Sequence, residues 1–346
     1  MSQRLDLPVR LRLIPTFPSK RVWKGETMSF KNYWYVVAQS QDIKDKPYRA
    51  MLLDEWLVLF RNEDNQITAL RDRCLHRSVR LSEGRIENGQ LRCMYHGWLY
   101  DKAGQVVQIP SEGDAAPKGP CRKAPKFHVR EVDGLVFVCL SEEPAIAEPF
   151  RSPHYGDKGW ATVRLVNRFQ NNVTNCVENF VDVPHTTFVH PKIFRDPEGH
   201  MVTLEMERKD GSVRVVYKDE KHKLGLFSWF LNPKNETYGH IDSFHQPNVT
   251  SVEYHFSSSK HFYITSQSVP VTETETLVYT DLTYSFGIFT PFARMFVKKL
   301  GQAVIDQDLV ILKNQNETIQ KYPDAFQNSG VDLMHVWIES IRDAIA

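Results

Sequence analysis

The stretches Cys74-Leu75-His76-Arg77 and Cys93-Met94-Tyr95-His96-Gly97-Trp98 decide how the first third of this chain folds. Each contributes one cysteine and one histidine, as C-x-H and C-x₂-H, and sixteen residues separate the two pairs of ligands. Short β patterns with turn residues between them surround both stretches. The four side chains therefore fall on loops, where they can converge on one metal centre.

Two kinds of metal centre use two cysteines and two histidines. Structural zinc sites usually take like ligands as neighbours, in the patterns C-x₂₋₄-C and H-x₃₋₅-H. A Rieske [2Fe–2S] cluster binds one iron through two cysteines and the other through two histidines. Because each loop here supplies one thiolate and one imidazole, the spacing favours the Rieske cluster, with structural zinc as the alternative.

The β patterns extend from about residue 50 to residue 140. Trp56-Leu57-Val58-Leu59-Phe60 predicts a buried strand, Asp64-Asn65 a turn, and Leu135–Leu140 the last strand of the series. Prolines cluster near residues 143–160 and mark a boundary. We expect a disordered or docking tail at 1–27, a Rieske domain at 28–145 and a catalytic domain at 146–346.

The second half of the chain combines strands with late helices. Residues 201–285 alternate as strands do. Thr290-Pro291 predicts a helix start, with threonine as N-cap and proline at the first helical position, and the helix is expected to reach about Glu317. A shorter helix is expected within 331–344. The fold class predicted for the whole chain is α+β.

A second candidate metal site lies between Glu178 and His190. His185 and His190 are candidates for the imidazoles of a 2-His-1-carboxylate iron site. Asn179, Asp182 and His185 are three residues apart, so they share one face of a helix. On a straight helix His185 and His190 diverge by roughly 140°, so both reach one metal only if the helix bends at Pro184. Two ordinary, partly buried histidines are the alternative.

Both stretches resemble the motifs of the ring-hydroxylating (Rieske non-haem iron) oxygenases. The match includes Cys74, His76, Cys93 and His96, and the pattern Asn179-x₂-Asp182-x₂-His185-x₄-His190. Leu75 and Met94 replace the usual prolines and Ser78 a usual glycine, but no ligand differs. The resemblance implies a small all-β Rieske domain followed by a helix-grip (START-like) domain, a curved antiparallel sheet around a long C-terminal helix.

In this family the third ligand of the mononuclear iron is a carboxylate on the late helix. Asp306 and Asp308 are both candidates. The residues three and four positions from Asp308 are all apolar, so on a helix Asp308 points into the core, where an unpaired carboxylate needs a cation. We therefore assign Asp308 as the ligand and Asp306 as a solvated surface acid.

The resemblance gives Asp182 a bridging role. It implies that Asp182 connects His185 to the Rieske His96 of a neighbouring subunit in a head-to-tail homotrimer, because the two metals of one chain are too far apart. A carboxylate that accepts an imidazole N–H also fixes its tautomer. Asn179 belongs to the same motif.

The implied function is that of a terminal oxygenase. Electrons from NAD(P)H pass through a separate ferredoxin or flavin-containing reductase and the [2Fe–2S] cluster to mononuclear Fe(II), which activates O₂ to monohydroxylate or oxidatively demethylate a small aromatic or alicyclic substrate. The short chain and Asn32–Ala38 resemble the α-only branch of the family. Aromatic-ring cis-dihydroxylation and a non-catalytic Rieske electron-transfer protein are the alternatives. Phe227, Trp229, Phe230 and Phe256 line the pocket or belong to the core.

The composition excludes several other classes. Among 346 residues, 43 Lys and Arg balance 42 Asp and Glu, so nucleic acid is not an expected partner. No apolar run approaches the ~18 residues of a transmembrane segment, and the first 28 residues lack the apolar core of a secretory signal. Five cysteines are sparse and odd in number, which argues against a disulfide framework and for a cytoplasmic location.

Overall fold

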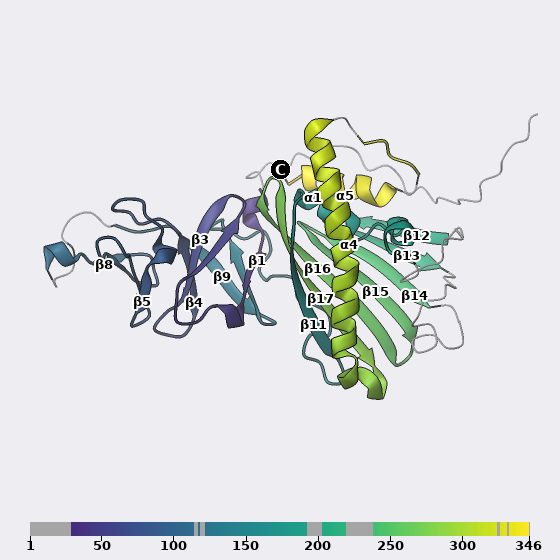
Figure 1. Ribbon diagram of the computed structural model, residues 1–346, viewed down its shortest axis with the longest axis horizontal. Helices are drawn as coiled ribbons and strands as arrows, with labels where there is room; N and C mark the ends of the chain where they lie inside the picture. The colour runs from purple at the N-terminus through teal and green to yellow at the C-terminus, as the bar shows by residue number, and fades with distance from the viewer. Residues whose placement is uncertain are drawn as a thin grey trace, which may run out of the picture.

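The computed structural model describes residues 29–113, 117, 122–191, 203–218, 238–323, 326–330 and 332–345. An all-β domain and a larger domain built from a sheet and helices lie side by side (Figure 1). The predicted tail at 1–27 and the pocket candidates Phe227, Trp229 and Phe230 lie outside the described residues. Among the described helices, none combines the length and hydrophobicity that crossing a bilayer requires.

The first domain consists of two antiparallel sheets. The six-stranded sheet has the order β1-β10-β9-β4-β3-β2. Its strands are β1 (Tyr35–Gln39), β2 (Tyr48–Leu52), β3 (Glu55–Arg61), β4 (Ile67–Arg71), β9 (Lys126–Val132) and β10 (Leu135–Cys139). The four-stranded sheet is formed by β5 (Arg85–Glu87), β6 (Gln90–Arg92), β7 (Leu99–Tyr100) and β8 (Val106–Gln108). The 3₁₀ turns are η1 (Phe30–Asn32), η2 (Ser40–Asp42), η3 (Leu81–Glu83) and η4 (Pro110–Glu112).

The strand predictions for this domain are confirmed. The strand expected at 56–60 lies within β3, where Trp56 is exposed and the four residues after it are buried, and the last strand of the series is β10. Asn65 adopts φ 59° between β3 and β4, as a tight turn requires.

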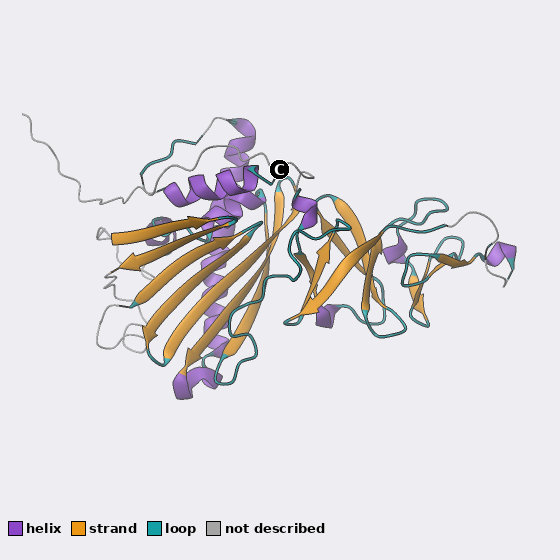
Figure 2. Cartoon of the chain, turned by 180° about the vertical axis from the view of Figure 1, so that it is seen from behind, coloured by secondary structure: helices purple, strands orange, loops and turns teal. Residues whose placement is uncertain are grey.

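The second domain is a seven-stranded antiparallel sheet with helices on one face. The strand order is β11-β17-β16-β15-β14-β13-β12. The strands are β11 (Ala161–Phe169), β12 (Thr203–Lys209), β13 (Ser212–Lys218), β14 (Gly239–His245), β15 (Val249–Ser257), β16 (Lys260–Thr272) and β17 (Glu275–Phe286). The helices are α1 (Val173–Asn179), α2 (His185–Val189), α4 (Arg294–Lys321) and α5 (Leu333–Asp343), and η6 (Gly287–Phe292) precedes α4. Seen from behind, the strands lie in front and α4 behind them (Figure 2).

The long helix differs in detail from the prediction. α4 begins at Arg294, not at Pro291, and continues to Lys321. Thr290 lies instead inside η6, where its hydroxyl accepts a hydrogen bond from the Phe286 N–H and donates to the Gly287 carbonyl. Because Thr290 stabilises this preceding 3₁₀ turn, it is not the N-cap of the α-helix. The shorter helix expected within 331–344 is α5.

Strand register places two rows of side chains on the face that α4 covers. Leu282 on this face lies against Gly301 of α4. One row is aromatic and contains Tyr217, His240, Tyr254, Phe262 and Tyr284. The adjacent row is mainly aliphatic and contains Val215, Asp242, Val252, Ile264 and Leu282. Only Asp242 and His240 bring ionisable groups into these two inward rows, apart from the tyrosines.

The two domains share backbone hydrogen bonds and a core. The Leu53 N–H donates to the Pro270 carbonyl at 2.8 Å, and the Asp54 N–H donates to the Val271 carbonyl at 3.1 Å. Leu53 and Asp54 form the β2–β3 turn, whereas Pro270 and Val271 belong to β16 of the second domain. Val269 of β16 is buried in the same apolar cluster as the residues of β1 and β10. The joint between the domains is therefore a packed core.

Candidate metal centres and cavity

The two Cys/His loops of the first domain have matching backbone geometry. The Cys74 N–H donates to the Val79 carbonyl, and the Ser78 N–H donates back to the Cys74 carbonyl. In the second loop Cys93 pairs in the same way with residues five and four positions further on. The fourth residue after each cysteine is left-handed, with φ 58° at Ser78 and 72° at Gly97. Ser78 thus adopts at a steric cost the conformation that glycine adopts freely.

The four predicted cluster ligands meet at the tips of these loops. Cys74 and Cys93 are buried, and the imidazole rings of His76 and His96 have centroids 4.5 Å apart. Trp98 stacks on His76 with a ring separation of 4.9 Å. His76 Nδ1 is buried and has no hydrogen-bond partner among the described residues. A buried donor or acceptor rarely stays unsatisfied, so this atom fits a ligand of the [2Fe–2S] cluster.

The environment of Cys74 favours a thiolate, the form that binds iron. A hydrogen bond with Cys93 lowers the pKa of Cys74 to about 5; burial opposes this shift and the Tyr100 hydroxyl adds to it. The Tyr100 oxygen lies 3.2 Å from Cys74 Sγ and accepts a hydrogen bond from the Leu75 N–H at 2.9 Å. Tyr100 was not predicted from the sequence.

The second site brings His185, His190 and Asp308 together, with ligand atoms all within 4.8 Å of one another. The two Nε2 atoms are 3.3 Å apart, and Asp308 Oδ1 lies 3.6 Å from the first and 3.1 Å from the second. His190 is 1% and Asp308 4% exposed. Asp308 Oδ1 has no hydrogen-bond partner within the part of the chain that the structure describes. Two imidazole nitrogens and an unsatisfied carboxylate oxygen directed at one point fit a divalent iron.

Of the two candidate carboxylates on α4, Asp306 and Asp308, only the predicted Asp308 faces the cavity. Asp308 is buried on the inner face of α4. Asp306 is exposed and accepts a hydrogen bond from Gln302. The interpretation of Asp306 as a surface acid agrees with this geometry.

The expectation that Asn179, Asp182 and His185 share one helix face is wrong. Asn179 is the last residue of α1, Asp182 lies in the turn that follows, and His185 is the first residue of α2. The helix breaks before Pro184, and the break lets His185 and His190 approach each other. All three side chains still line the cavity described below.

Two side chains hold the histidines from outside. Gln307 Oε1 lies 2.7 Å from His190 Nδ1, and Asp182 Oδ2 lies 3.5 Å from His185 Nδ1. The contact of Gln307 with His190 was not predicted from the sequence. The only sequence signal for it is that Gln307 lies next to Asp308. A hydrogen bond such as that of Gln307 fixes the tautomer and ring orientation of a metal-binding histidine. His185 Nδ1 has no hydrogen-bond partner among the described residues, so Asp182 acts on it through its charge.

Charge at this site also favours a cation. Burial lowers the pKa of His185, but the carboxylates of Asp182 and Asp308 outweigh burial and raise that pKa to about 9. Burial raises the pKa of Asp308, but the two neighbouring histidines outweigh it and hold that pKa below its ordinary value. The two carboxylates beside the imidazoles therefore make this site favourable for a positive ion.

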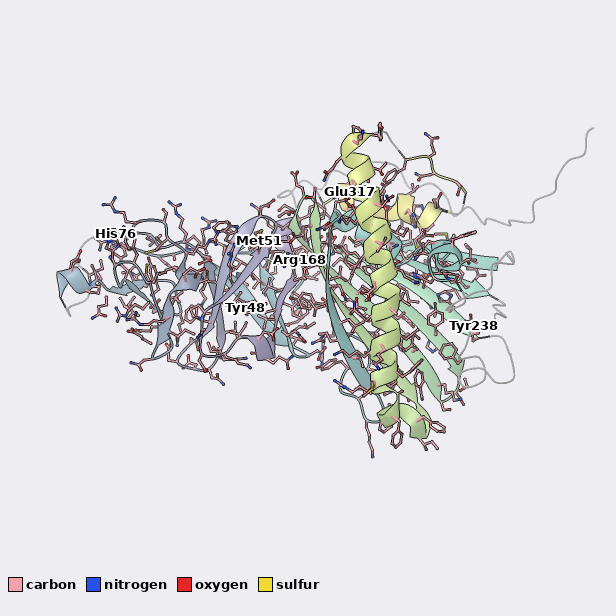
Figure 3. The ribbon with its side chains drawn as sticks, viewed as in Figure 1. Tyr48, Met51, His76, Arg168, Tyr238 and Glu317 are labelled. Carbon is pink, nitrogen blue, oxygen red and sulfur yellow. The ribbon has the colours of Figure 1, made fainter. Side chains whose placement is uncertain are left out.

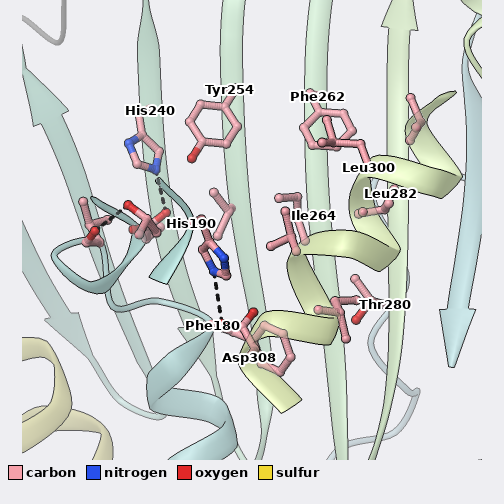
Figure 4. Close-up of a pocket in the computed structure, with 18 of the residues that line it drawn as sticks. Phe180, His190, His240, Tyr254, Phe262, Ile264, Thr280, Leu282, Leu300 and Asp308 are labelled. Atoms are coloured by element: carbon pink, nitrogen blue, oxygen red, sulfur yellow. Dashed lines mark hydrogen bonds and ion pairs between the residues drawn. The ribbon is translucent and has the colours of Figure 1, made fainter. Parts of the chain in front are cut away.

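A cavity of about 440 Å³ extends from these residues between the sheet and α4. Figure 4 shows His190 and Asp308 beside it, with Tyr254, Phe262 and Ile264 along the sheet. Its walls are mostly aromatic and aliphatic, and the predicted Phe256 is among them. Phe289, Phe292 and Phe296 line the cavity and are also exposed, so it opens towards η6. This size is typical of sites for small organic molecules.

The two candidate centres lie far apart in one chain. His76 is at the end of the first domain remote from α4, the helix that carries Asp308 (Figure 3).

Comparisons with known proteins reproduce this division. Residues 33–127 match the Rieske [2Fe-2S] domain, and residues 169–335 match the vanillate O-demethylase oxygenase C-terminal domain. A putative toluene-4-sulfonate monooxygenase system iron-sulfur subunit of Comamonas testosteroni is 32% identical over 210 residues, 59% of this chain and 57% of that protein. The dicamba O-demethylase oxygenase component of Stenotrophomonas maltophilia is 32% identical over 191 residues, 54% and 56% of the two chains. The chain thus spans little more than half the length of these curated relatives.

Solved structures share the whole architecture. Dicamba monooxygenase bound to 3,6-dichlorosalicylic acid has a TM-score of 0.78 at 24% identity, over 92% of this chain and 98% of that one. NdmA of Pseudomonas putida CBB5 with caffeine has a TM-score of 0.74 at 23% identity, over 90% of each chain. At these identities the likeness establishes the fold.

A Rieske all-β domain is joined here to a sheet-rich domain with a long C-terminal helix and a buried group of two histidines and an aspartate, which is the architecture of the two-domain Rieske oxygenases. The chain belongs to the Rieske non-haem iron oxygenases, with a catalytic domain of the vanillate O-demethylase type. Its cofactors are a Rieske [2Fe–2S] cluster and a mononuclear iron.

Proposed function

We propose that Cys74, His76, Cys93 and His96 bind the [2Fe–2S] cluster and that His185, His190 and Asp308 bind the mononuclear iron. The observation that carries the second assignment is a buried group of two imidazoles and a carboxylate at the edge of an apolar cavity. Three protein ligands on one side leave positions open on the metal. A non-catalytic electron carrier would need neither the triad nor the cavity.

The proposed activity is that of a terminal oxygenase that monohydroxylates or oxidatively demethylates a small organic substrate with O₂. Its relatives include proteins named as monooxygenases and demethylases, which supports this activity. Electrons would come from NAD(P)H through a separate ferredoxin or flavin-containing reductase. When bound, the cluster supplies electron transfer and the iron supplies oxygen activation. Ring cis-dihydroxylation is the alternative reaction.

The residues of the chain would position the substrate and limit access of water. Phe180 and Ile264 line the cavity close to the iron ligands. Gln307 and Asp182 would orient the two imidazoles through their Nδ1 atoms. Asn179, whose buried Oδ1 has no partner among the described residues, faces the same cavity and would hydrogen-bond to substrate or water.

Metal and sulfide analysis tests these assignments. Anaerobically purified protein should contain about three irons and two sulfides per chain. His190→Ala should lose one iron and retain the cluster spectrum, whereas the matched surface variant Asp306→Asn should retain all three. With NADH and a surrogate reductase, the native protein should consume O₂ when substrate is present, and formaldehyde release would identify demethylation. Two irons in native protein after Fe(II) reconstitution would contradict the mononuclear site.

We infer that the chain forms a head-to-tail homotrimer in which Asp182 connects His185 to the partner subunit's His96. The separation of the two centres within one chain supports this, because electron transfer then needs a shorter path between chains. His96 is exposed on its own domain, and the Asp182 side chain is 25% exposed. A closed ring of identical heterologous contacts is a common form of homo-oligomer.

Asp182→Asn tests the bridge. This variant should retain both metals and lose most of its turnover, because the amide no longer accepts an imidazole N–H in the same way. Iron content, the cluster spectrum and O₂ uptake are the measurements, with Asp306→Asn as control. Full turnover in Asp182→Asn would contradict the bridging role, and a monomeric mass in solution would contradict the trimer.

We also propose a cytoplasmic location and a domain boundary between residues 145 and 146. The buried free thiols of Cys139 and Cys176 support a reducing compartment. The proline-rich segment between β10 and β11 supports the boundary, with 28–145 as the Rieske domain, 146–346 as the catalytic domain and 1–27 outside both.

A further inference from the structure

The inward face of the sheet gives the cavity an apolar floor. Tyr254 and Phe262 are cross-strand neighbours in the aromatic row, and Val252, Ile264 and Leu282 follow one another in the aliphatic row. All five side chains line the cavity. A floor of this kind suits a planar, largely apolar molecule, because burial of apolar surface supplies about 25 cal/mol per Å².

Carboxylates are the prevailing charged side chains around the cavity. Within the described part of the chain, the lining contains no lysine or arginine. It does contain the carboxylates of Asp182, Asp242 and Asp308. A divalent iron would offset Asp308 and one further negative charge, which leaves one of the three carboxylates uncompensated. A carboxylate or sulfonate on a ligand would lose its hydration here without gaining a lysine or arginine of the described lining, which is costly.

His240 and Asp242 form a polar pair in this apolar wall. Both are 1% exposed, and His240 Nε2 lies 2.9 Å from Asp242 Oδ1. His240 is held between two tyrosine rings, with centroids 4.4 Å away at Tyr217 and 4.5 Å away at Tyr254. In Figure 4 it lies beside Tyr254, on the sheet side of the cavity. The imidazole is therefore fixed in place before any ligand binds.

One atom of the pair is unsatisfied. Asp242 Oδ2 is buried and has no hydrogen-bond partner among the described residues. Leaving such an oxygen unpaired in the folded protein is unfavourable. A ligand hydroxyl or N–H at this point would supply the missing donor, whereas an anionic group would add a further acceptor and a repelling charge.

We propose that the substrate is an uncharged, largely apolar molecule of two or more rings whose single hydroxyl or N–H group binds the His240–Asp242 pair. This inference rests on the proposed oxygenase function and names its substrate class. Asp242 accepts the hydrogen bond, His240 holds Asp242 in place, and the apolar remainder lies over the sheet towards His190 and Asp308. His240 and Asp242 would determine which substrates bind and would take no part in oxygen chemistry.

Equilibrium dialysis of the anaerobic holoenzyme with matched probes tests the proposal. 2-Naphthol, naphthalene and 2-naphthoate have the same ring system with a hydroxyl, no polar group and an anion; estrone and estrone 3-sulfate repeat the first and last at a larger size. We expect the hydroxyl compound in at least one series to bind tenfold or more tightly than its partners. Equal or tighter binding of the anions, or no binding in either series, would overturn the proposal.

Substitutions on β14 test whether the His240–Asp242 pair causes the preference for the hydroxyl compound. Asp242→Val should remove the preference for 2-naphthol over naphthalene, and Asp242→Asn should narrow the difference between 2-naphthol and 2-naphthoate by removing a negative charge. His245→Gln alters a histidine on the same strand that does not line the cavity, and should leave the order unchanged. Melting curves check that each variant is folded. If both Asp242 variants fold and retain the native order, the proposal is wrong.

Binding and turnover separate this proposal from the one before it. The dialysis needs no electrons and no O₂. The predicted order of affinity without substrate-dependent O₂ uptake would overturn the oxygenase function and support the binding site. O₂ uptake with an anionic substrate, unaffected by the Asp242 variants, would support the oxygenase function and overturn the proposed substrate class.

Discussion

Replacement of Gln307 by methionine should weaken iron binding although Gln307 does not touch the metal. Methionine retains the length of the side chain and the helix propensity of α4, but it removes the acceptor 2.7 Å from His190 Nδ1. His190 is 1% exposed whereas Gln307 is exposed, so the contact is shielded from water on the histidine side only. Loss of a partner to a buried polar group costs about 1–3 kcal/mol. Outer hydrogen bonds of metal-binding histidines are worth about 10–100-fold in affinity, in agreement with that figure.

The assay is anaerobic competition for Fe(II) against a coloured chelator, on protein whose cluster is intact by its visible spectrum. We expect Gln307→Met to bind iron about 10–100-fold more weakly. Gln307→Glu retains an oxygen acceptor and should bind at least as tightly as the native chain. Asp306→Asn changes the adjacent exposed residue and should have no effect. Native affinity in Gln307→Met would refute the idea that this contact orients His190.

Three further predictions follow from charges in the catalytic domain. Burial raises the pKa of Glu178 to about 8, so between about pH 4.5 and 8 the folded protein keeps a proton that the unfolded chain releases. The free energy of unfolding should therefore fall as the pH rises through this range. In urea titrations at pH 6 and 8, Glu178→Gln should show a smaller fall than the native protein. An unchanged slope would contradict the assignment. The pKa of His185 is raised to about 9, so iron must displace a proton below that pH, and Fe(II) affinity should rise by up to about tenfold per pH unit between pH 7 and 9; a flat profile would be evidence against it. Arg164 binds both oxygens of Asp281 at 2.6 Å with 11% and 3% of the two side chains exposed, so Arg164→Met should destabilise the fold by about 3–5 kcal/mol, whereas Arg85→Met, at an exposed pair with Glu87, should cost less than about 1 kcal/mol. Similar losses in the two variants, measured by thermal denaturation, would show that burial of the ion pair is not what matters.

Much of the site could be predicted because its residues obey local periodicity. Asp308 was distinguished from Asp306 by helix phase together with the family pattern around the late-helix carboxylate, since only one of two residues so spaced can face the core. The Cys/His loops were recognisable because both ligands of each loop lie within four positions of one another. Ser78 departs from the family glycine and still adopts the left-handed conformation, stabilised by a hydrogen bond between its hydroxyl and Arg73.

The remaining features depend on contacts between elements distant in sequence. Gln307 and His190 are in contact because α2 packs beside α4. No local sequence pattern predicts this packing. The importance of His240 and Asp242 follows from the register of β14 with β13 and β15, which sequence alternation does not fix. The start of α4 was misplaced because Thr290 can either cap an α-helix or stabilise a 3₁₀ turn. In the structure it stabilises the 3₁₀ turn after β17. The break after Asn179 came earlier than Pro184 alone would predict.

The shared core between the domains has a consequence for how the protein melts. A two-domain chain with a hydrated linker usually shows two unfolding transitions. Here the turn at Leu53 and Asp54 is hydrogen-bonded to β16, and Val269 is packed among residues of the other domain. Neither half can expose its surface at the joint without exposing that of the other. Calorimetry should therefore give a single cooperative transition, and damage to the cluster should reduce the stability of the iron-binding half as well.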